Sequence, residues 1–535
     1  MYIEPNTEIR ILKECPLDTT YEHTIFFSSP SDQEAYFKSL TKFPLDKQSY
    51  QRVKRGYMRV AIPAEKLYDC NYLMFKNTGF ESSRWFYAFI KSVEYVNNTT
   101  SEIEFELDVM QTWYWDYDLQ KCFVEREHSA TDNIGDNLVP ESLELGEYVA
   151  DYLSGTNMLA PTSLVVASTF KAVGDDPEHT TTFEDVHSTY YGGMFSGLHY
   201  TVFPNNQSGA EACGQFIASA GAKSDGIVSV FIMPTIMITE DGGQPKTFTL
   251  PVQKSITSLG SYHEVKNNKL FTYPYNFLYV TNLQGNGASF RYEFFNDSAC
   301  NFTVTGTMNC TPEVVLAPNN YKGVSVNLDE KMTLGGYPQL PFNTDTFRTW
   351  LSQNALALPL NALSTTLTTA QSVSSASAIA STAKLGSMAS ATAGVTATFA
   401  PVIGAIAVAG ILAQVSQHYI LPDQSKGGAG SQTLASMRML DYAFMNKHIT
   451  PEFAEIIDGY FSLYGYATHK VKVPNRAVRP YWTYTKTVGC VITGSIPCDD
   501  ANKICGIYDK GITFWRSGAN VGKYHLDNRP SVVPV

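Results

Sequence analysis

The chain has 535 residues, a length that predicts roughly three to four domains of about 150 residues each. Charged residues make up 17% of it and aromatic residues 13%, which excludes disorder and suffices for a large buried core. Lysine and arginine number 39 against 51 aspartates and glutamates, a net charge of -12. Nucleic-acid binding by attraction needs basic stripes, so this balance argues against it. It does allow a duct through which DNA slides without adhering.

Nine cysteines are scattered singly along the chain, with no CxxC pair. Structural zinc sites need cysteine or histidine ligands in closely spaced pairs, and a chain with so much core-forming material does not depend on disulfides. We therefore expect buried free thiols, formed in a reducing cytoplasm. The first residues, MYIEPNTEIRILKE, contain no apolar stretch, so we expect no secretory signal peptide.

Residues 1–129 alternate apolar and polar side chains as β-strands do. Two such runs, Arg84–Val96 and Ser101–Trp115, flank the turn Asn97–Thr100 and predict a β-hairpin. The second run has two faces, one apolar with Ile103, Phe105, Leu107 and Val109, the other acidic with Glu102, Glu104, Glu106 and Asp108. We expect a sheet with one buried face and one wet face.

Residues 130–340 form a β-rich middle region punctuated by glycine, proline and asparagine. The β-branched and aromatic runs Ile227–Ile238, Phe271–Val280 and Phe302–Thr307 predict strands in it. Residues 341–430 differ sharply, because Lys384 is the only charged residue between Arg348 and Asp423. This third region opens with a short helical pattern that places four apolar side chains on one face: Phe347, Trp350, Leu351 and Leu358.

The segment Phe399–Ala413 carries no polar side chain. Seven large apolar residues cover both sides of the expected helix: Phe399, Val402, Ile403 and Ile406 on one, Val408, Ile411 and Leu412 on the other. A helix that is apolar all round lies inside protein or inside lipid, and this segment is shorter than the ~20 residues that span a bilayer. We predict that these seven residues insert into a membrane. A buried hairpin at the centre of an oligomer is the alternative.

Residues 431–535 follow the glycine-rich run Gly427–Gly430 and predict helices, then strands. One helix is expected over Gln432–Asn446, and a second begins at Thr450-Pro451, an N-cap followed by proline at the first helical position. The second helix continues with apolar residues at helical spacing: Phe453, Ile456, Ile457, Tyr460 and Phe461. Strands are expected at Tyr464–Val473, Tyr481–Val488 and Ile512–Trp515.

A search for catalytic, cofactor-binding or metal-binding motifs finds none. There is no GxSxG, Walker A or GxGxxG motif, and His263-Glu264 lacks the second histidine of a zincin helix. A group of polar residues is better interpreted as exposed loops than as a metal site: Glu178, His179, Asp185, His187 and His199. The run Asp132–Asn137 lacks the final glutamate of a calcium loop, and Asp116 and Asp118 have no partner that suggests a glycosidase. We expect no enzyme activity, no cofactor and no bound metal.

Several aromatic-rich runs near both chain ends resemble one protein family. They are Arg84–Ile90, Phe105–Trp113, Val124–His128, Tyr464–Tyr466, Val473–Arg476, Arg479–Trp482 and Gly511–Trp515. These runs resemble the distal tail tube or knob protein of Picovirinae-type short-tailed bacteriophages that infect Gram-positive bacteria. The resemblance implies a mainly β fold with some α, in which both chain ends build β-barrel tube domains and a helix-flanked apolar loop lies inside a channel.

The resemblance also implies a homohexameric virion protein at the tail tip that contacts other tail proteins. Genomic DNA is expected to pass through its channel without sequence-specific binding. From the net charge of -12 we expect that channel to be lined mainly by acidic and neutral side chains. The apolar loops plug the channel until genome ejection and then enter the host cytoplasmic membrane. A tail-associated cell-wall hydrolase and a secreted pore-forming toxin are alternatives, opposed by the missing catalytic motif and the missing signal peptide.

Overall fold

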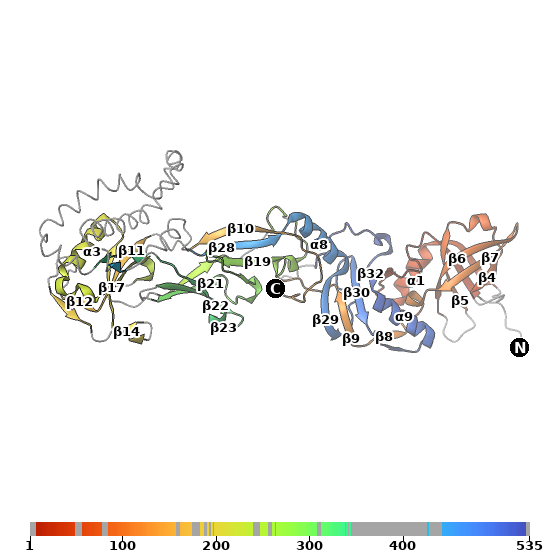
Figure 1. Cartoon of the computed structure of the whole chain (residues 1–535). Helices are drawn as coiled ribbons and strands as arrows, with labels where there is room; N and C mark the ends of the chain where they lie inside the picture. The colour runs from red at the N-terminus through yellow and green to blue at the C-terminus, as the bar shows by residue number, and fades with distance from the viewer. Residues whose placement is uncertain are drawn as a thin grey trace, which may run out of the picture. The chain divides into compact units, whose positions relative to one another are not determined.

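The computed structural model (Figure 1) describes residues 7–48, 56–77, 84–156, 161–173, 182–186, 190–191, 194–195, 197–238, 247–254, 259–262, 264–307, 312–337, 339–340, 342–343, 425–426 and 441–530. The expected helix around Trp350 and the apolar segment Phe399–Ala413 lie outside these residues. The chain divides into two compact units. Unit 1 comprises Met1–Glu147, Thr257–Tyr275 and Ile449–Val535, and unit 2 comprises Tyr148–Ile256 and Asn276–His448.

The N-terminal sheet of unit 1 has six strands in the order β3-β1-β5-β6-β7-β4, all antiparallel to their neighbours. The strands are β1 (Thr7–Lys13), β3 (Thr41–Gln48), β4 (Tyr57–Val60), β5 (Cys70–Asn77), β6 (Phe86–Asn97) and β7 (Thr100–Leu107). Helix α1 (Pro30–Ser39) has proline in its first turn and is capped by Ser29, whose side chain accepts from the Asp32 N–H. The pairing of β6 with β7 confirms the predicted hairpin, and Ile103 and Phe105 lie on its buried face.

Strand β7 ends at Leu107, before the predicted alternation ends. Asp108 caps the short helix α2 (Val109–Thr112) through its Oδ1, which accepts from the N–H groups of Met110 at 3.0 Å and Gln111 at 3.1 Å. Its Oδ2 accepts the Tyr72 hydroxyl at 2.7 Å. The prediction that Asp108 shares the acidic face and Val109 the apolar face of a strand was therefore wrong, because local capping bonds replaced the strand ladder.

A five-stranded sheet in unit 1 joins strands from both chain ends. Its order is β2-β32-β30-β9-β29. The strands are β2 (His23–Ile25), β9 (Cys122–Glu127), β29 (Tyr466–Lys472), β30 (Trp482–Val488) and β32 (Ile512–Trp515), and beside them β8 (Tyr117–Leu119) pairs with β31 (Ile492–Gly494). Strands β29, β30 and β32 confirm the three strands predicted near the C-terminus.

Helix α8 (Pro451–Tyr464) begins at the predicted Thr450-Pro451 boundary. Ile457 and Phe461 are buried as expected, but Ile456 is 67% exposed and Asp458 is buried in its place. A second helix, α9 (Cys498–Lys510), was not predicted. Its signal was present in the sequence, because Ile504, Ile507 and Tyr508 are spaced as one helical face and all three are buried.

The described residues of unit 2 form a set of sheets and one α-helix, α3 (Gln207–Ser219). One four-stranded sheet contains β10 (Tyr148–Gly155), β28 (Ala443–Ile449), β19 (Asn276–Thr281) and β20 (Gly287–Phe290); another contains β16 (His199–Pro204), β11 (Thr162–Ser168), β17 (Ile227–Pro234) and β25 (Gln339–Leu340). The third contains β18 (Phe248–Val252), β21 (Cys300–Thr307), β22 (Glu313–Tyr321), β23 (Val324–Val326) and β24 (Met332–Leu334).

Shorter elements complete the described chain. Two-stranded pairs are β12 (Phe170–Ala172) with β13 (Phe183–Asp185), β14 (Tyr190–Tyr191) with β15 (Met194–Phe195), and β26 (Phe342–Asn343) with β27 (Ser425–Lys426). The 3-10 helices are η1 (Ala64–Lys66), η2 (Gly221–Gly226), η3 (Thr235–Met237), η4 (Asn268–Phe271), η5 (Tyr292–Phe294), η6 (Leu328–Glu330) and η9 (Gly518–Asn520). The mainly β fold with a few helices is the fold class predicted from the sequence.

Strand β28 corrects the predicted helix Gln432–Asn446 at its described end. Residues from Ala443 onward form a strand that pairs antiparallel with β19 and are not helical. Phe444, Asn446 and His448 alternate along the strand and are all buried. Helix and strand patterns are hard to separate in a short mixed run, and here pairing with a neighbouring strand decides the conformation.

Candidate functional site

An apolar row crosses three strands of the five-stranded sheet in unit 1. Phe123 on β9 is directly opposite Val471 on β29 and opposite Val488 on β30. All three side chains are exposed, Val471 to 69%, Val488 to 55% and Phe123 to 39%. We call these three residues the apolar row. Exposed apolar side chains that are contiguous, rather than scattered singly, are typical of an interaction surface.

The other face of the same strands packs into the core, so the apolar row lies on the face of the sheet that points away from the core. Val124 and Thr487, the neighbours of Phe123 and Val488 in sequence, are fully buried. His469 stacks on the Phe123 ring with centroids 5.9 Å apart, from a backbone φ of 46° at an irregularity in β29. Strand β29 is the last in the described order of this sheet. The apolar row therefore begins at a sheet edge, where a further strand or surface is able to pack.

The acidic face of the β6–β7 hairpin carries ion pairs. Glu102 bonds Arg59 at 2.7 Å, and Glu106 bonds Lys91 at 2.9 Å and Lys503 at 2.5 Å. These contacts depress the pKa of Glu106, chiefly through the hydrogen bonds from the two lysines. The face is thus ionised but partly neutralised.

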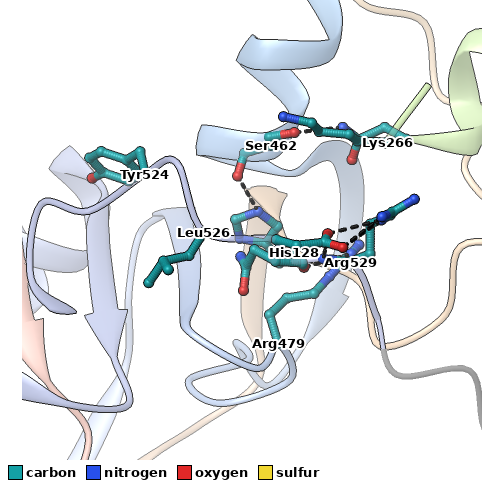
Figure 2. Close-up of a pocket in the computed structure, with 10 residues that line it drawn as sticks. His128, Lys266, Ser462, Arg479, Tyr524, Leu526 and Arg529 are labelled. Atoms are coloured by element: carbon teal, nitrogen blue, oxygen red, sulfur yellow. Dashed lines mark hydrogen bonds and ion pairs between the residues drawn. The ribbon is translucent and has the colours of Figure 1, made fainter. Parts of the chain in front are cut away.

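A basic pocket lies elsewhere in unit 1, around the buried imidazole of His128 (Figure 2). We call it the Arg479 pocket; its lining residues are His128, Lys266, Asn267, Ser462, Arg479, Tyr524, Leu526, Asp527, Asn528 and Arg529. The His128 Nε2 lies 3.2 Å from the Ser462 carbonyl, and its Nδ1 accepts from the Tyr484 N–H at 2.8 Å. Both contacts suit the neutral ring, and burial together with the Arg479 charge lowers the pKa of His128 to about 3.

The residues singled out from the sequence fall in different places. The seven membrane-insertion residues, Phe399 to Leu412, lie outside the described residues. So do Glu178, His179 and His187, while Asp185 bonds Lys223 at 2.9 Å. Asp132 accepts hydrogen bonds from Tyr466 at 2.6 Å and Asn268 at 2.9 Å. Asp116 bonds Arg84 at 2.9 Å, so both carboxylates have partners within the protein.

The described residues hold neither a membrane-spanning helix nor a cluster of metal ligands. None of the described helices has the length and apolar character needed to cross a membrane. In the same part of the chain, no three histidine, cysteine or acidic side chains gather as metal ligands would. Eight described cysteines are free thiols, six of them buried, as the sequence predicted.

Sequence reasoning missed both surfaces in unit 1. The apolar row joins residues far apart in the chain, and nothing local in β9 marks Phe123 as exposed. Arg479 belonged to a run singled out for its resemblance to the tail family, without any role assigned. Only the folded arrangement brings Lys266 and Arg529 beside it.

Comparisons with known proteins define first a class. Residues 5–118 match the family of caudoviral major tail protein N-termini, so the N-terminal sheet belongs to a structural protein of a phage tail. Residues 244–529 match the C-terminal domain of the tail knob protein gp9 of Bacillus phage phi29. Since this match covers more than half of the chain, the protein belongs to the phi29 gp9 tail knob family, which confirms the resemblance found in the sequence.

Whole-chain relatives agree with this assignment. The tail knob protein gp9 of Bacillus phage phi29 is 24% identical over 98% of both chains, and that of Bacillus phage B103 is 23% identical over the same shares. Among solved structures, the tail knob protein gp12 of bacteriophage C1 covers 96% of this chain and 98% of its own with a TM-score of 0.62. At 14% identity it supports the fold alone. The protein is a component of the virion tail.

Proposed function

We propose that six copies of the protein form a ring in the tail knob, around a channel for the phage genome. A cyclic ring closes by heterologous contacts, in which each subunit places one patch on a different patch of its neighbour. The exposed apolar row carries this proposal, because it lies at a sheet edge built from both chain ends. Packing against the next subunit would remove Val471, Phe123 and Val488 from water.

The ring is tested by charge substitutions in the apolar row. In the paired variant Phe123→Asp plus Val471→Asp, two carboxylates would be buried at the subunit contact, so we expect monomers in sedimentation where wild type gives hexamers. Tyr68→Asp is the matched control, because Tyr68 is also 69% exposed but lies outside the apolar row. Electron microscopy of the wild type should show six-fold rings. Monomeric wild type at micromolar concentration, or a hexameric double variant, would contradict the proposal.

The channel is proposed to be lined mainly by acidic and neutral side chains, so that DNA is repelled rather than held. The net charge of -12 per chain supports this. An assembled ring should bind duplex DNA weakly at any salt concentration. Tight binding with a steep salt dependence would need phosphate-facing lysines and arginines, and would exclude this lining.

The apolar segment Phe399–Ala413 is proposed to plug the channel and later to insert into the host membrane. This proposal is supported by the pairing of the two strands that precede and follow the segment in the sequence. Strands β26 and β27 pair Phe342 with Lys426 and Asn343 with Ser425, so the two ends of the intervening 81 residues meet. A long excursion with closed ends can be displaced without disturbing the sheets on either side.

Dye release from liposomes tests the membrane role. The variant Ile403→Asp plus Ile406→Asp should abolish release, since each charge costs roughly 2.5–3.5 kcal/mol at the bilayer centre. Ser374→Asp plus Ser375→Asp adds the same charge outside the apolar segment and should leave release unchanged. Equal release from all three proteins would leave only the plug.

The role proposed is structural, without catalysis. The relatives from Bacillus phages phi29 and B103 are both named tail knob proteins, which supports this interpretation. Clearing of a purified cell-wall suspension by the protein would favour the hydrolase alternative instead.

A further inference from the structure

The guanidinium of Arg479 is buried with one edge unpaired. Arg479 is 3% exposed. Of its three side-chain nitrogens, only Nη1 makes a hydrogen bond, which it donates to the Asn528 carbonyl over 3.3 Å. Nε and Nη2 have no hydrogen-bond partner. These two nitrogens share one edge of the guanidinium, the edge that pairs side-on with two oxygens of a carboxylate or phosphate.

The charges around this edge are unbalanced. Three cations line the Arg479 pocket, namely Arg479, Lys266 and Arg529, against a single anion, Asp527 (Figure 2). They come from three separate segments of unit 1. Asp527 pairs with Arg529 at 2.6 Å, but both side chains are more than half exposed, so this ion pair is weak and open to exchange. Lys266 acts through its charge on the same carboxylate, so Asp527 serves two of the three cations.

The acidic and hydroxyl groups nearest Arg479 leave this edge of the guanidinium without a well-formed hydrogen bond. Asp132 acts on Arg479 through its charge, and the Tyr466 hydroxyl through its charge and a loose hydrogen bond, but neither meets Nε or Nη2 at good hydrogen-bond geometry. Asp132 is occupied by Tyr466 and Asn268. A buried cation without a hydrogen-bonded counter-ion is costly, which points to a partner that the chain itself does not supply.

We propose that the Arg479 pocket binds a small oxyanion, whose two oxygens accept the Nε–H and Nη2–H of Arg479. Lys266 and Arg529 supply additional positive charge, and the Ser462 hydroxyl lies at the same pocket wall. The segment Tyr524–Arg529 forms the outer wall and has to shift for a ligand to reach the buried edge. The two N–H groups of a guanidinium edge can donate to two oxygens of either a phosphate or a carboxylate. The oxyanion is therefore a free phosphate or a carboxylate of a neighbouring tail protein.

The test measures thermal unfolding of the full chain in inorganic phosphate, in acetate and in chloride at equal ionic strength. Phosphate, acetate or both should raise the midpoint above that in chloride, through preferential binding to the folded state. A response to phosphate alone supports a phosphate ligand, and a response to acetate supports a carboxylate. No response beyond chloride would overturn the proposal.

Variants separate this site from a general salt effect. Arg479→Gln should abolish the response, and Lys266→Gln should weaken the apparent affinity on the order of fivefold, as loss of one charged contact does. Lys266 is exposed, so its variant is expected to fold even if Arg479→Gln does not. Lys470→Gln, at an exposed lysine on β29, is the matched control and should respond as wild type does. An unchanged response in Lys266→Gln would also overturn the proposal. This outcome is independent of whether the protein forms the proposed hexameric ring.

Discussion

Removal of the Asp458 carboxylate should destabilise unit 1 more than any surface change on the same helix. Asp458 is 1% exposed on α8 and accepts four hydrogen bonds from the segment Tyr262–Asn267. Its Oδ2 accepts the Tyr262 hydroxyl and the Lys266 N–H, both at 2.8 Å, and its Oδ1 accepts the Asn267 N–H at 3.0 Å and Nδ2 at 2.7 Å. The carboxylate thus fastens an excursion of the chain to α8.

The magnitude follows from those four bonds. Hydrogen bonds to a charged group contribute about 1.5–3 kcal/mol each, but bonds that share one group are not additive. For Asp458→Ala we expect a loss of about 4 kcal/mol, comparable to breaking a buried pair. Asp458→Asn keeps the oxygen that faces Asn267 and turns an amide N–H toward the Lys266 N–H, for a loss of about 2–3 kcal/mol. Tyr262→Phe removes one donor and should lose about 1 kcal/mol.

Urea unfolding followed by tryptophan fluorescence measures these losses. Trp482 and Trp515 report on unit 1, because their rings pack 5.2 Å apart in its core and the Trp482 indole donates to the Ser462 carbonyl of α8 at 3.1 Å. Glu455→Ala, at an exposed position of the same helix, is the control and should change stability by less than about 0.5 kcal/mol. If Asp458→Ala lowered the free energy of unfolding no more than Glu455→Ala does, the stabilising role assigned to the Asp458 carboxylate would be contradicted.

Three further predictions use the same unfolding measurement. Gly465 has a φ of 65° and an added Cβ would lie 2.2 Å from the Glu127 carbonyl oxygen, so Gly465→Ala should lose at least about 2 kcal/mol, while Gly459→Ala, in open space inside α8, should gain up to about 1 kcal/mol. His128 has a folded pKa of about 3 against 6.5 unfolded, so stability should fall by roughly 2 kcal/mol as pH is lowered from 6.5 to 4.5, and His128→Gln should flatten this slope. Burial raises the pKa of Asp108 from 3.8 to about 6, so its contribution has the opposite sign: stability should fall by roughly 2 kcal/mol as pH rises from 3.8 to about 6, and Asp108→Asn should remove this fall. An unchanged pH slope in either variant would contradict the assigned burial.

The sequence by itself determined those features that depend on neighbours along the chain. The β6–β7 hairpin follows from alternation around Asn97–Thr100, and α8 begins where Thr450-Pro451 places it. The aromatic runs identified the tail knob family, because they are long enough to be specific without any structure. The hairpin turn and the start of the helix are both set by residues that are adjacent in the sequence.

Tertiary structure decided what depends on distant residues. Asp108 lies outside the strand because its carboxylate caps α2 and accepts the Tyr72 hydroxyl. Ala443–Ile449 is a strand because it pairs with β19. The apolar row exists only where three strands from both chain ends meet, and the unpaired edge of Arg479 only where three segments converge. The periodicity of a segment indicates which of its faces is buried, but the hydrogen-bond partners and the exposed surfaces depend on groups that are adjacent only in space.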